Sequence, residues 1–144
     1  SKHAWLLAHE RELAEAAQPA PGAVALVREL QARDCRLGIL TRNAHALALL
    51  TLQAIGLDDC FASADVIGRD EAPPKPDPGG LLHLAGQWQV PTQALVMVGD
   101  YLFDLECARA AGAHGVLVNL PENPWPALSS GYAEDCAELL RQLS

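Results

Sequence analysis

Short apolar runs alternate with helical segments along most of this chain, and the alternation limits the fold more than any other feature of the sequence. We expect strands at four of these runs, which are residues 36–41, 65–68, 94–98 and 115–119. Segments of helical composition lie at 22–34, 43–55, 79–89, 102–111 and 134–143. This order is typical of strand–helix–strand crossovers, which build a parallel sheet with helices on both faces.

The N-terminal segment differs from the rest in composition. Residues 2–18 are rich in Ala, Leu and Glu, which are good helix formers, and the Pro-Ala-Pro-Gly sequence at 19–22 would end a helix there. We therefore predict a helix over 2–18, followed by an α/β fold. The expected architecture is a three-layer Rossmann-like parallel sheet with helices on both faces.

Length, composition and charge exclude several classes of protein. A chain of 144 residues with 50% hydrophobic residues fits one domain with a substantial core. The net charge is -8 and the lysines are only Lys2 and Lys75, so no basic face is available for nucleic acid. No apolar stretch approaches the ~20 residues of a membrane span. We expect neither a nucleic-acid partner nor a membrane partner.

The four cysteines show no metal-binding or redox spacing. They lie 25, 47 and 29 positions apart, and no C-x-x-C pair occurs. They are Cys35, Cys60, Cys107 and Cys136. Reduced cysteines in a cytoplasmic protein are the simplest interpretation.

Candidate functional residues follow from the expected sheet, because open α/β sheets bind ligands at the carboxyl ends of their strands. One strand ends at Thr41, and Asp100 follows another, with Asp104 in the first turn of the next helix. Lys75 lies in a proline-rich loop between them. Two neighbouring carboxylates suit Mg²⁺, which proteins hold with one or two carboxylates, water and substrate phosphate. Lys75 and the Thr41 hydroxyl suit a phosphoryl group.

Each of these residues has a structural interpretation as well. Thr41 alone is more often a hydrogen-bonding residue at a helix entry, and Lys75 alone is more often a solvated loop residue. Asp100 and Asp104 could be turn and helix-cap residues. Their joint occurrence at successive strand ends, in this order, favours a phosphate site. His45, one turn beyond Thr41, could approach a substrate, but a surface histidine on a helix is the simpler interpretation. Trp125, in a proline-rich loop, could line a pocket, but packing over the sheet edge is simpler.

Three segments resemble sequence motifs of the haloacid dehalogenase-like hydrolase superfamily, in its phosphoglycolate-phosphatase-like branch. Leu37–Thr41 looks like the second motif, a strand ending in Thr or Ser. Lys75–Pro78 looks like the third, the K-P-x-P loop, and Val96–Asp104 looks like the fourth, G-D-x-x-x-D. The fourth is followed by the Ala-Arg-Ala-Ala-Gly ending that is common in the family. The resemblance extends over roughly residues 21–119.

The resemblance implies a role for each matched residue. Asp100 would be a direct magnesium ligand, and Asp104 would hold a metal-bound water or steady the lysine. Lys75 would bind phosphate and restrain the nucleophile, and Thr41 with the backbone after it would bind a phosphate oxygen. Family members often have Asn directly after this Thr, whereas here Arg42 precedes Asn43. Arg42 and Asn43 are therefore candidate substrate contacts.

The family's first motif is missing from this sequence. That motif, D-x-D-x-T, supplies the nucleophilic and acid/base aspartates, and no Asp here is followed two positions later by another Asp. In the family the first motif ends a strand in the middle of the sheet, between the strands that end at Thr41 and Asp100. We therefore expect the chain to lack an N-terminal stretch. Residues 1–20 would be the end of a helical cap segment, and 21–144 a core without its first strand.

Two functions from different classes follow. The first is a Mg²⁺-dependent phosphatase that hydrolyses a small phosphorylated metabolite through an aspartyl-phosphate, with its nucleophile on a segment absent from this chain. The second is a non-catalytic module of the same fold that binds a phosphate ligand or a partner. A dehalogenase on the same scaffold is a third possibility within enzymes. We expect the 144-residue chain alone not to turn over substrate.

Overall fold

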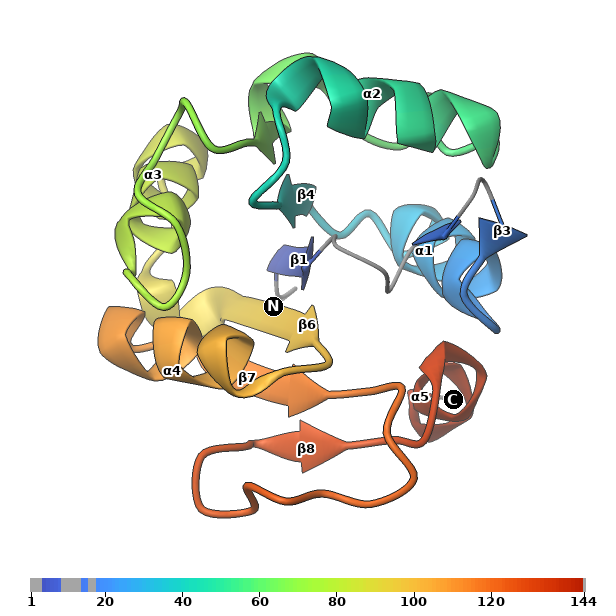
Figure 1. Ribbon diagram of the computed structural model, residues 1–144, viewed down its shortest axis with the longest axis vertical. Helices are drawn as coiled ribbons and strands as arrows, with labels where there is room; N and C mark the ends of the chain where they lie inside the picture. Colours follow the sequence, from blue (N-terminus) through green and yellow to red (C-terminus); the bar gives the residue numbers. More distant parts are fainter. Residues whose placement is uncertain (1–3, 9–13, 16–17, 144) are drawn as a thin grey trace.

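A computed structural model describes residues 4–8, 14–15 and 18–143 of the chain. Its main element is a six-stranded sheet of order β5-β4-β1-β6-β7-β8, in which every neighbouring pair is parallel (Figure 1). The strands are β1 (Ala4–Ala8), β4 (Leu37–Leu40), β5 (Val66–Ile67), β6 (Leu95–Gly99), β7 (His114–Leu117) and β8 (Gly131–Tyr132). A two-stranded antiparallel pair, β2 (Ala14–Glu15) and β3 (Gln18–Pro19), follows β1.

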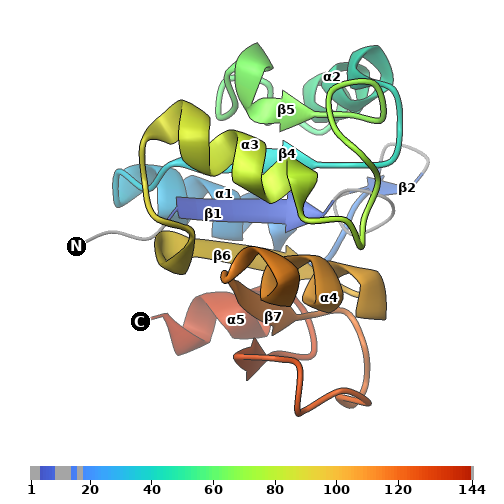
Figure 2. The ribbon, with the colours of Figure 1, turned by 90° about the vertical axis from the view of Figure 1, so that its left-hand side faces the viewer.

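The described residues include five α-helices, which cover the two faces of this sheet. They are α1 (Ala23–Ala32), α2 (His45–Ala54), α3 (Gly79–Trp88), α4 (Leu102–Ala111) and α5 (Cys136–Gln142). Helices α3 and α4 lie side by side on one face, whereas α1 and α5 lie on the opposite face (Figures 1 and 2). Two short 3-10 turns, 63–65 and 92–94, lead into β5 and β6. The expected three-layer α/β architecture is thereby confirmed.

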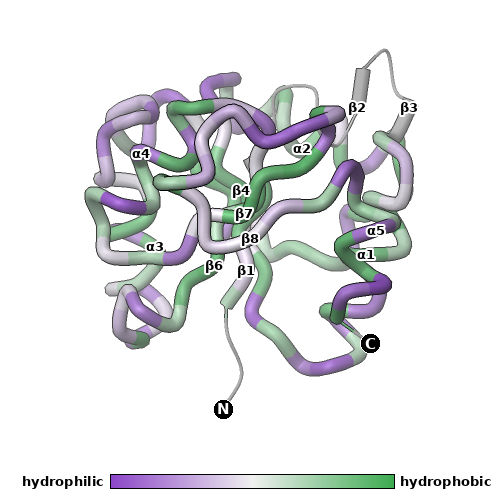
Figure 3. The backbone as a smooth tube through the Cα atoms, turned by 90° about the horizontal axis from the view of Figure 1, so that it is seen from below, coloured by the Kyte–Doolittle hydropathy of each residue, from purple (hydrophilic) through white to green (hydrophobic). Residues whose placement is uncertain are grey.

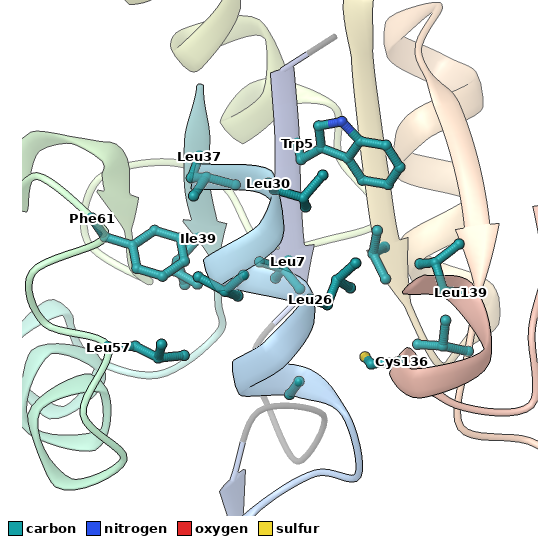
Figure 4. Packing of buried hydrophobic residues seen from close by; sticks show 14 of the residues in the cluster. Trp5, Leu7, Leu26, Leu30, Leu37, Ile39, Leu57, Phe61, Cys136 and Leu139 are labelled. Carbon is teal, nitrogen blue, oxygen red and sulfur yellow. The ribbon is translucent and has the colours of Figure 1, made fainter. Parts of the chain in front are cut away.

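The sheet separates two hydrophobic cores, and β1 contributes to both. Trp5 and Leu7 pack with residues of α1, α2 and α5 (Figure 4), whereas Ala4 and Leu6 pack with residues of α3 and α4. This division follows from the strand geometry, in which successive side chains point to opposite faces. The hydropathy of the chain has the same arrangement, with hydrophobic stretches in the central strands and hydrophilic ones in the outer helices and loops (Figure 3).

The helix predicted over 2–18 is wrong, because residues 4–8 form the central strand β1. β1 is also the central strand that the sequence was expected to lack. β1 pairs with β4 on one side and β6 on the other, so the interior edges of both strands are satisfied. Four successive residues, Ala4 to Leu7, are buried. A helix packed on one face would expose part of such a run, whereas a strand inside the sheet buries all of it.

The other predicted strands and helices occur with small differences in their ends. The strands expected at 36–41, 65–68, 94–98 and 115–119 correspond to β4, β5, β6 and β7. The two-residue strand β8 was not predicted. Gly112 ends α4 as expected, with a left-handed φ of 80° that glycine adopts at little cost. Within the described residues no helix has the length and apolar character needed to cross a membrane.

Candidate functional site

Thr41 and Asp100 lie at the same level of the carboxyl edge of the sheet, on either side of β1. Leu7 of β1 pairs with Ile39 of β4 and with Val98 of β6, and each candidate residue comes two positions after its paired residue. Two strand spacings place their backbones about 10 Å apart. The topology therefore brings together two residues that are 59 positions apart in the sequence.

Lys75 is buried at this edge and forms an ion pair with the carboxylate of Asp104. The Nζ–Oδ1 distance is 2.8 Å, and the two side chains are only 4% and 5% exposed. Lys75 comes from the loop between β5 and α3, and Asp104 from the first turn of α4. A lone lysine in a loop is usually solvated, whereas Lys75 is buried and paired with Asp104.

Both oxygens of the Asp104 carboxylate are engaged. Oδ1 binds Lys75, and Oδ2 accepts hydrogen bonds from the backbone N–H groups of Asp100 at 3.2 Å and Tyr101 at 3.1 Å. Burial raises the pKa of Asp104 above its ordinary value, while the Lys75 ammonium opposes this shift and the charge of Asp100 adds to it. Asp104 therefore fixes both the lysine and the turn that presents Asp100.

The lysine loop is also attached to α4 one turn further along that helix. The Cys107 thiol donates a hydrogen bond of 3.3 Å to the backbone carbonyl of Asp77. The Asp77 carboxylate in turn accepts from the N–H of Gly79, at 2.8 Å, where α3 begins. Burial raises the pKa of Cys107 to about 12, so its thiol stays protonated and able to donate. These contacts fix the loop on the C-terminal side of Lys75.

Thr41 is buried, at 3% exposure, where β4 ends. Its Oγ1 accepts a hydrogen bond of 3.1 Å from the N–H of Asn43, which shapes the turn before α2. Arg42 is exposed and Asn43 is half-buried in that turn. The structure thus places Arg42 and Asn43 beside Thr41 at the carboxyl edge, and their substrate contacts stay predictions.

The residues present fit a magnesium ion held through Asp100. The Asp100 carboxylate lies near the Asp104 carboxylate, whose pKa it raises, and a shared cation would relieve that repulsion. Among the described residues no group of three His, Cys, Asp or Glu forms a metal cluster. Mg²⁺ does not require one, because it is usually bound by one or two carboxylates with water and phosphate. Asp104, with both oxygens engaged, suits an orienting role better than direct ligation.

Two of the residues considered above, His45 and Trp125, make contacts within the chain. His45 bridges β5 and the turn before it, since its Nδ1 lies 2.8 Å from the carbonyl of Val66 and its Nε2 lies 3.1 Å from Ser63 Oγ. Trp125 packs edge-on against Tyr101, with ring centroids 5.7 Å apart. His45 thus stabilises the approach to β5, and Trp125 joins the loop after β7 to the start of α4.

Sequence reasoning missed two contributors to this site. Cys107 was considered only as a reduced cysteine, although its position three residues after Asp104 puts both on one face of α4. Tyr101 was not singled out, and its backbone N–H binds Asp104 while its ring is exposed. The residues that follow β1, from His9 to Leu13, lie outside the described residues, and their sequence contains no D-x-D.

Comparisons with known proteins agree with this fold. Residues 2–112 match the haloacid dehalogenase-like hydrolase family, and the chain belongs to that family. A phosphoglycolate phosphatase from Rhodospirillum rubrum is 38% identical over 112 residues, which cover 77% of this chain and 46% of that protein. The chain spans about half the length of the curated relatives that it matches.

Solved structures of similar fold include two with high structural similarity. A predicted phosphoglycolate phosphatase from Haemophilus somnus superposes with a TM-score of 0.79 at 21% identity, covering 88% of this chain and 58% of that one. The core domain of a Streptococcus pneumoniae protein of proposed phosphoglycolate phosphatase activity gives 0.77 at 19% identity, covering 99% of this chain and 96% of that one. At these identities the likeness concerns the fold.

Proposed function

We propose that this chain forms the phosphate- and magnesium-binding part of a phosphatase that acts on a small phosphorylated metabolite through an aspartyl-phosphate. The observation that carries the proposal is the buried ion pair of Lys75 and Asp104 at the carboxyl edge, beside Asp100 and across from Thr41. The name of the Rhodospirillum rubrum relative, phosphoglycolate phosphatase, supports the same class of reaction.

The energetics of the ion pair favour a functional role over a structural one. Removing two charges from water costs several kcal/mol per ion, and apolar residues of similar size often give equal or greater stability. A buried Lys75–Asp104 pair is therefore a poor means of stabilising a fold. Its value is an ammonium group held rigidly in a site of low polarity, where a cation stabilises developing phosphoryl charge most strongly.

Each residue of the site would have its own role in binding or catalysis. The Thr41 hydroxyl and the N–H groups at the start of α2 would bind phosphoryl oxygens, and Arg42 and Asn43 would contact the substrate beside them. Lys75 would neutralise charge on the phosphoryl group as the bond to the leaving oxygen breaks. Asp100 would hold Mg²⁺, which supplies Lewis-acid polarisation of the phosphoryl oxygens when bound. Asp104 would keep Lys75 and Asp100 in position.

The nucleophilic carboxylate would come from a segment that this sequence does not contain, because the resemblance puts it at the end of the central strand and no D-x-D follows β1 in the sequence. Such a segment has to bring an aspartate to the carboxyl edge between Thr41 and Asp100, which is where β1 ends. The covalent step would then form the aspartyl-phosphate and release the alcohol, and water would hydrolyse the intermediate.

The second candidate is a binding module of the same fold that holds a phosphate ligand without turnover. The absence of a D-x-D pair from the sequence favours it. The denatured intact mass of the naturally produced protein separates the two. A mass well above that of 144 residues, with additional residues before Ser1, supports the enzyme, whereas a mass equal to this chain favours the module.

Calorimetric titration of the purified chain with inorganic phosphate, in the presence and absence of Mg²⁺, tests the site itself. We expect phosphate binding that Mg²⁺ strengthens and that Lys75→Met and Thr41→Val each weaken at least about ten-fold, as expected from losing one charged or polar contact of 1.4 kcal/mol or more. Arg141→Met on α5 removes one positive charge far from the site and should leave the affinity unchanged.

The same preparation should show no turnover of p-nitrophenyl phosphate. Turnover that Lys75→Met abolishes would overturn the placement of the nucleophile outside this chain. Absence of phosphate binding by the folded, unaltered chain would overturn the proposed site.

The proposed partner is a small phosphorylated substrate, and the proposed location is the cytoplasm. The four cysteines form no disulfide in the described part of the chain, which suits a reducing compartment. The net charge of -8 is unfavourable for binding nucleic acid.

A further inference from the structure

Three aromatic side chains gather at the start of α4, directly after Asp100 of the proposed phosphate site. Tyr101 follows Asp100 in the chain, and its side chain is 51% exposed. Its ring meets Phe103 of α4 at a centroid distance of 5.1 Å and Trp125 at 5.7 Å, both edge-on, with interplanar angles of 82° and 84°. Because β6 and β7 are parallel neighbours, the segments that follow them leave the sheet at the same edge.

The loop that carries Trp125 is fixed by its own hydrogen bonds. The Trp125 N–H donates to Asn123 Oδ1 at 2.9 Å, and Asn123 Nδ2 donates to Ser129 Oγ at 2.8 Å. Ser129 Oγ then donates to the Trp125 carbonyl at 3.2 Å. Prolines at 121, 124 and 126 further restrict the backbone. The ring is therefore held in place before any ligand arrives, which lowers the entropic cost of binding.

The position of these rings gives them a chemical use. Small-molecule sites combine a few polar groups with apolar and aromatic walls, and here the polar groups are Lys75, Asp100 and Thr41. An ester phosphate held by those groups carries its organic group on the side away from them. Tyr101, the residue next to Asp100, offers an exposed uncharged ring to such a group in a chain that is otherwise strongly acidic.

We propose that Tyr101 and Trp125 form an aromatic wall that selects phosphomonoesters whose organic group contains a planar ring, such as an aryl group or a nucleobase, over small aliphatic esters. This inference rests on the proposed function, because it needs the phosphate to be held at Lys75 and Asp100. Phe103 supports the Tyr101 ring from the side of α4.

Calorimetric titration of the chain with phenyl phosphate, methyl phosphate and inorganic phosphate, all with Mg²⁺, tests the wall. Phenyl and methyl phosphate carry the same charged group and differ in the ring. We expect phenyl phosphate to bind about five-fold more tightly than methyl phosphate, as one aromatic contact allows. Tyr101→Leu and Trp125→Leu should each lower that ratio toward one, and Trp125→Leu should leave the affinity for inorganic phosphate unchanged.

A matched control is Phe61→Leu, which removes a buried ring from the core on the other side of the sheet and should lower stability without changing the ratio. The indole N–H resonance of Trp125 gives a second readout. Phenyl phosphate should shift it, whereas the resonance of Trp88, whose indole N–H is hydrogen-bonded to Asp65 at 2.8 Å, should stay in place.

The aromatic wall would be overturned if phenyl and methyl phosphate bound the unaltered chain equally well. It would also be overturned if the affinity ratio stayed the same in both Tyr101→Leu and Trp125→Leu. Neither result would contradict the phosphate site. Failure of inorganic phosphate to bind would overturn the proposed function, and the wall with it.

Discussion

Gly99 packs so closely against Asp104 that the carboxylate occupies the space a side chain at position 99 would need. A Cβ built on Gly99 would approach the Oδ2, Cγ and Cβ atoms of Asp104 more closely than real Cβ atoms approach any neighbour. The absence of a side chain at 99 is therefore what lets Asp104 reach back over the end of β6 and bind the N–H groups of Asp100 and Tyr101.

Gly99→Ala should accordingly damage the site by displacing the Asp104 carboxylate. We expect phosphate affinity with Mg²⁺ to fall at least about ten-fold, because charged hydrogen bonds worth roughly 1.5–3 kcal/mol are lost. Overpacking should also lower the free energy of unfolding by about 1–3 kcal/mol. Calorimetric titration and urea denaturation measure the two effects.

Gly86→Ala provides the matched control. Gly86 is exposed within α3, and a Cβ there would meet no atom within 4 Å. Alanine in that helix should raise the free energy of unfolding by about 0.8–1 kcal/mol and leave phosphate affinity unchanged. Normal phosphate affinity in Gly99→Ala would contradict the close approach described above.

The buried ion pair gives a second prediction, on stability. Lys75→Met leaves the Asp104 carboxylate buried without its cation, which should lower the free energy of unfolding by about 3–5 kcal/mol at pH 7.5. Glu29→Gln breaks the exposed Arg33–Glu29 pair, whose side chains are 39% and 41% exposed, and should change stability by less than about 0.5 kcal/mol. Urea denaturation of the three proteins measures both differences.

The cost of Lys75→Met should depend on pH with a definite sign. The folded-state pKa of Asp104 is already raised by burial, and Lys75 opposes that rise, so removal of Lys75 raises the pKa further. A folded pKa above the unfolded value means that stability is lost as pH rises through the folded pKa. The variant should therefore be closest to the unaltered protein near pH 5. A cost that does not change with pH would show that removal of Lys75 does not raise the pKa of Asp104 in the folded protein.

The sequence predicted which candidate residues share one edge of the sheet, because strand ends are local signals. The apolar runs of β4 and β6 stand out, and the polar residues that follow them, Thr41 and Asp100, are assigned to one edge by topology alone. The burial of Lys75 was beyond sequence reasoning, since it depends on how the loop after β5 packs on α4. The same holds for Cys107 and Tyr101, whose partners are distant in sequence.

The error at the N-terminus has a different physical origin. Residues 4–8 lie in an Ala-, Leu- and Glu-rich segment whose intrinsic preference is helical, and five residues are too few for periodicity to separate helix from strand. Pairing with β4 and β6 on both sides overrides that preference. β8 was missed for a related reason, because two half-buried residues carry no pattern at all.

Three substitutions test the central position of β1. Trp5, Leu6 and Leu7 are consecutive and buried, and they alternate between the two cores. Trp5→Ala, Leu6→Ala and Leu7→Ala should each lower the free energy of unfolding by about 2–5 kcal/mol. The backbone N–H groups of β1 should also exchange with deuterium more slowly than those of the edge strand β8, which pairs only with β7. Rapid exchange at 4–8 would contradict a paired central strand.

The Cys107 thiol gives the last prediction, at alkaline pH. Its pKa is raised to about 12 in the folded protein, whereas an unfolded cysteine has a pKa of about 8.5. The folded state therefore holds this proton more tightly than the unfolded state, and the stability that it contributes is lost as pH rises between those two values. Each pH unit in that interval can lower the free energy of unfolding by at most about 1.4 kcal/mol through this group.

Urea denaturation under reducing conditions at pH 7.5, 9 and 10 measures this loss, with Cys107→Ala as the reference. The variant lacks the thiol and should lose less stability between pH 7.5 and pH 10 than the unaltered protein. It should also be less stable at pH 7.5, because the carbonyl of Asp77 loses its hydrogen bond from the thiol. Parallel pH profiles for the two proteins would mean that the thiol is accessible to water in the folded state, and Cys107 would then not be the anchor that fixes the Lys75 loop to α4.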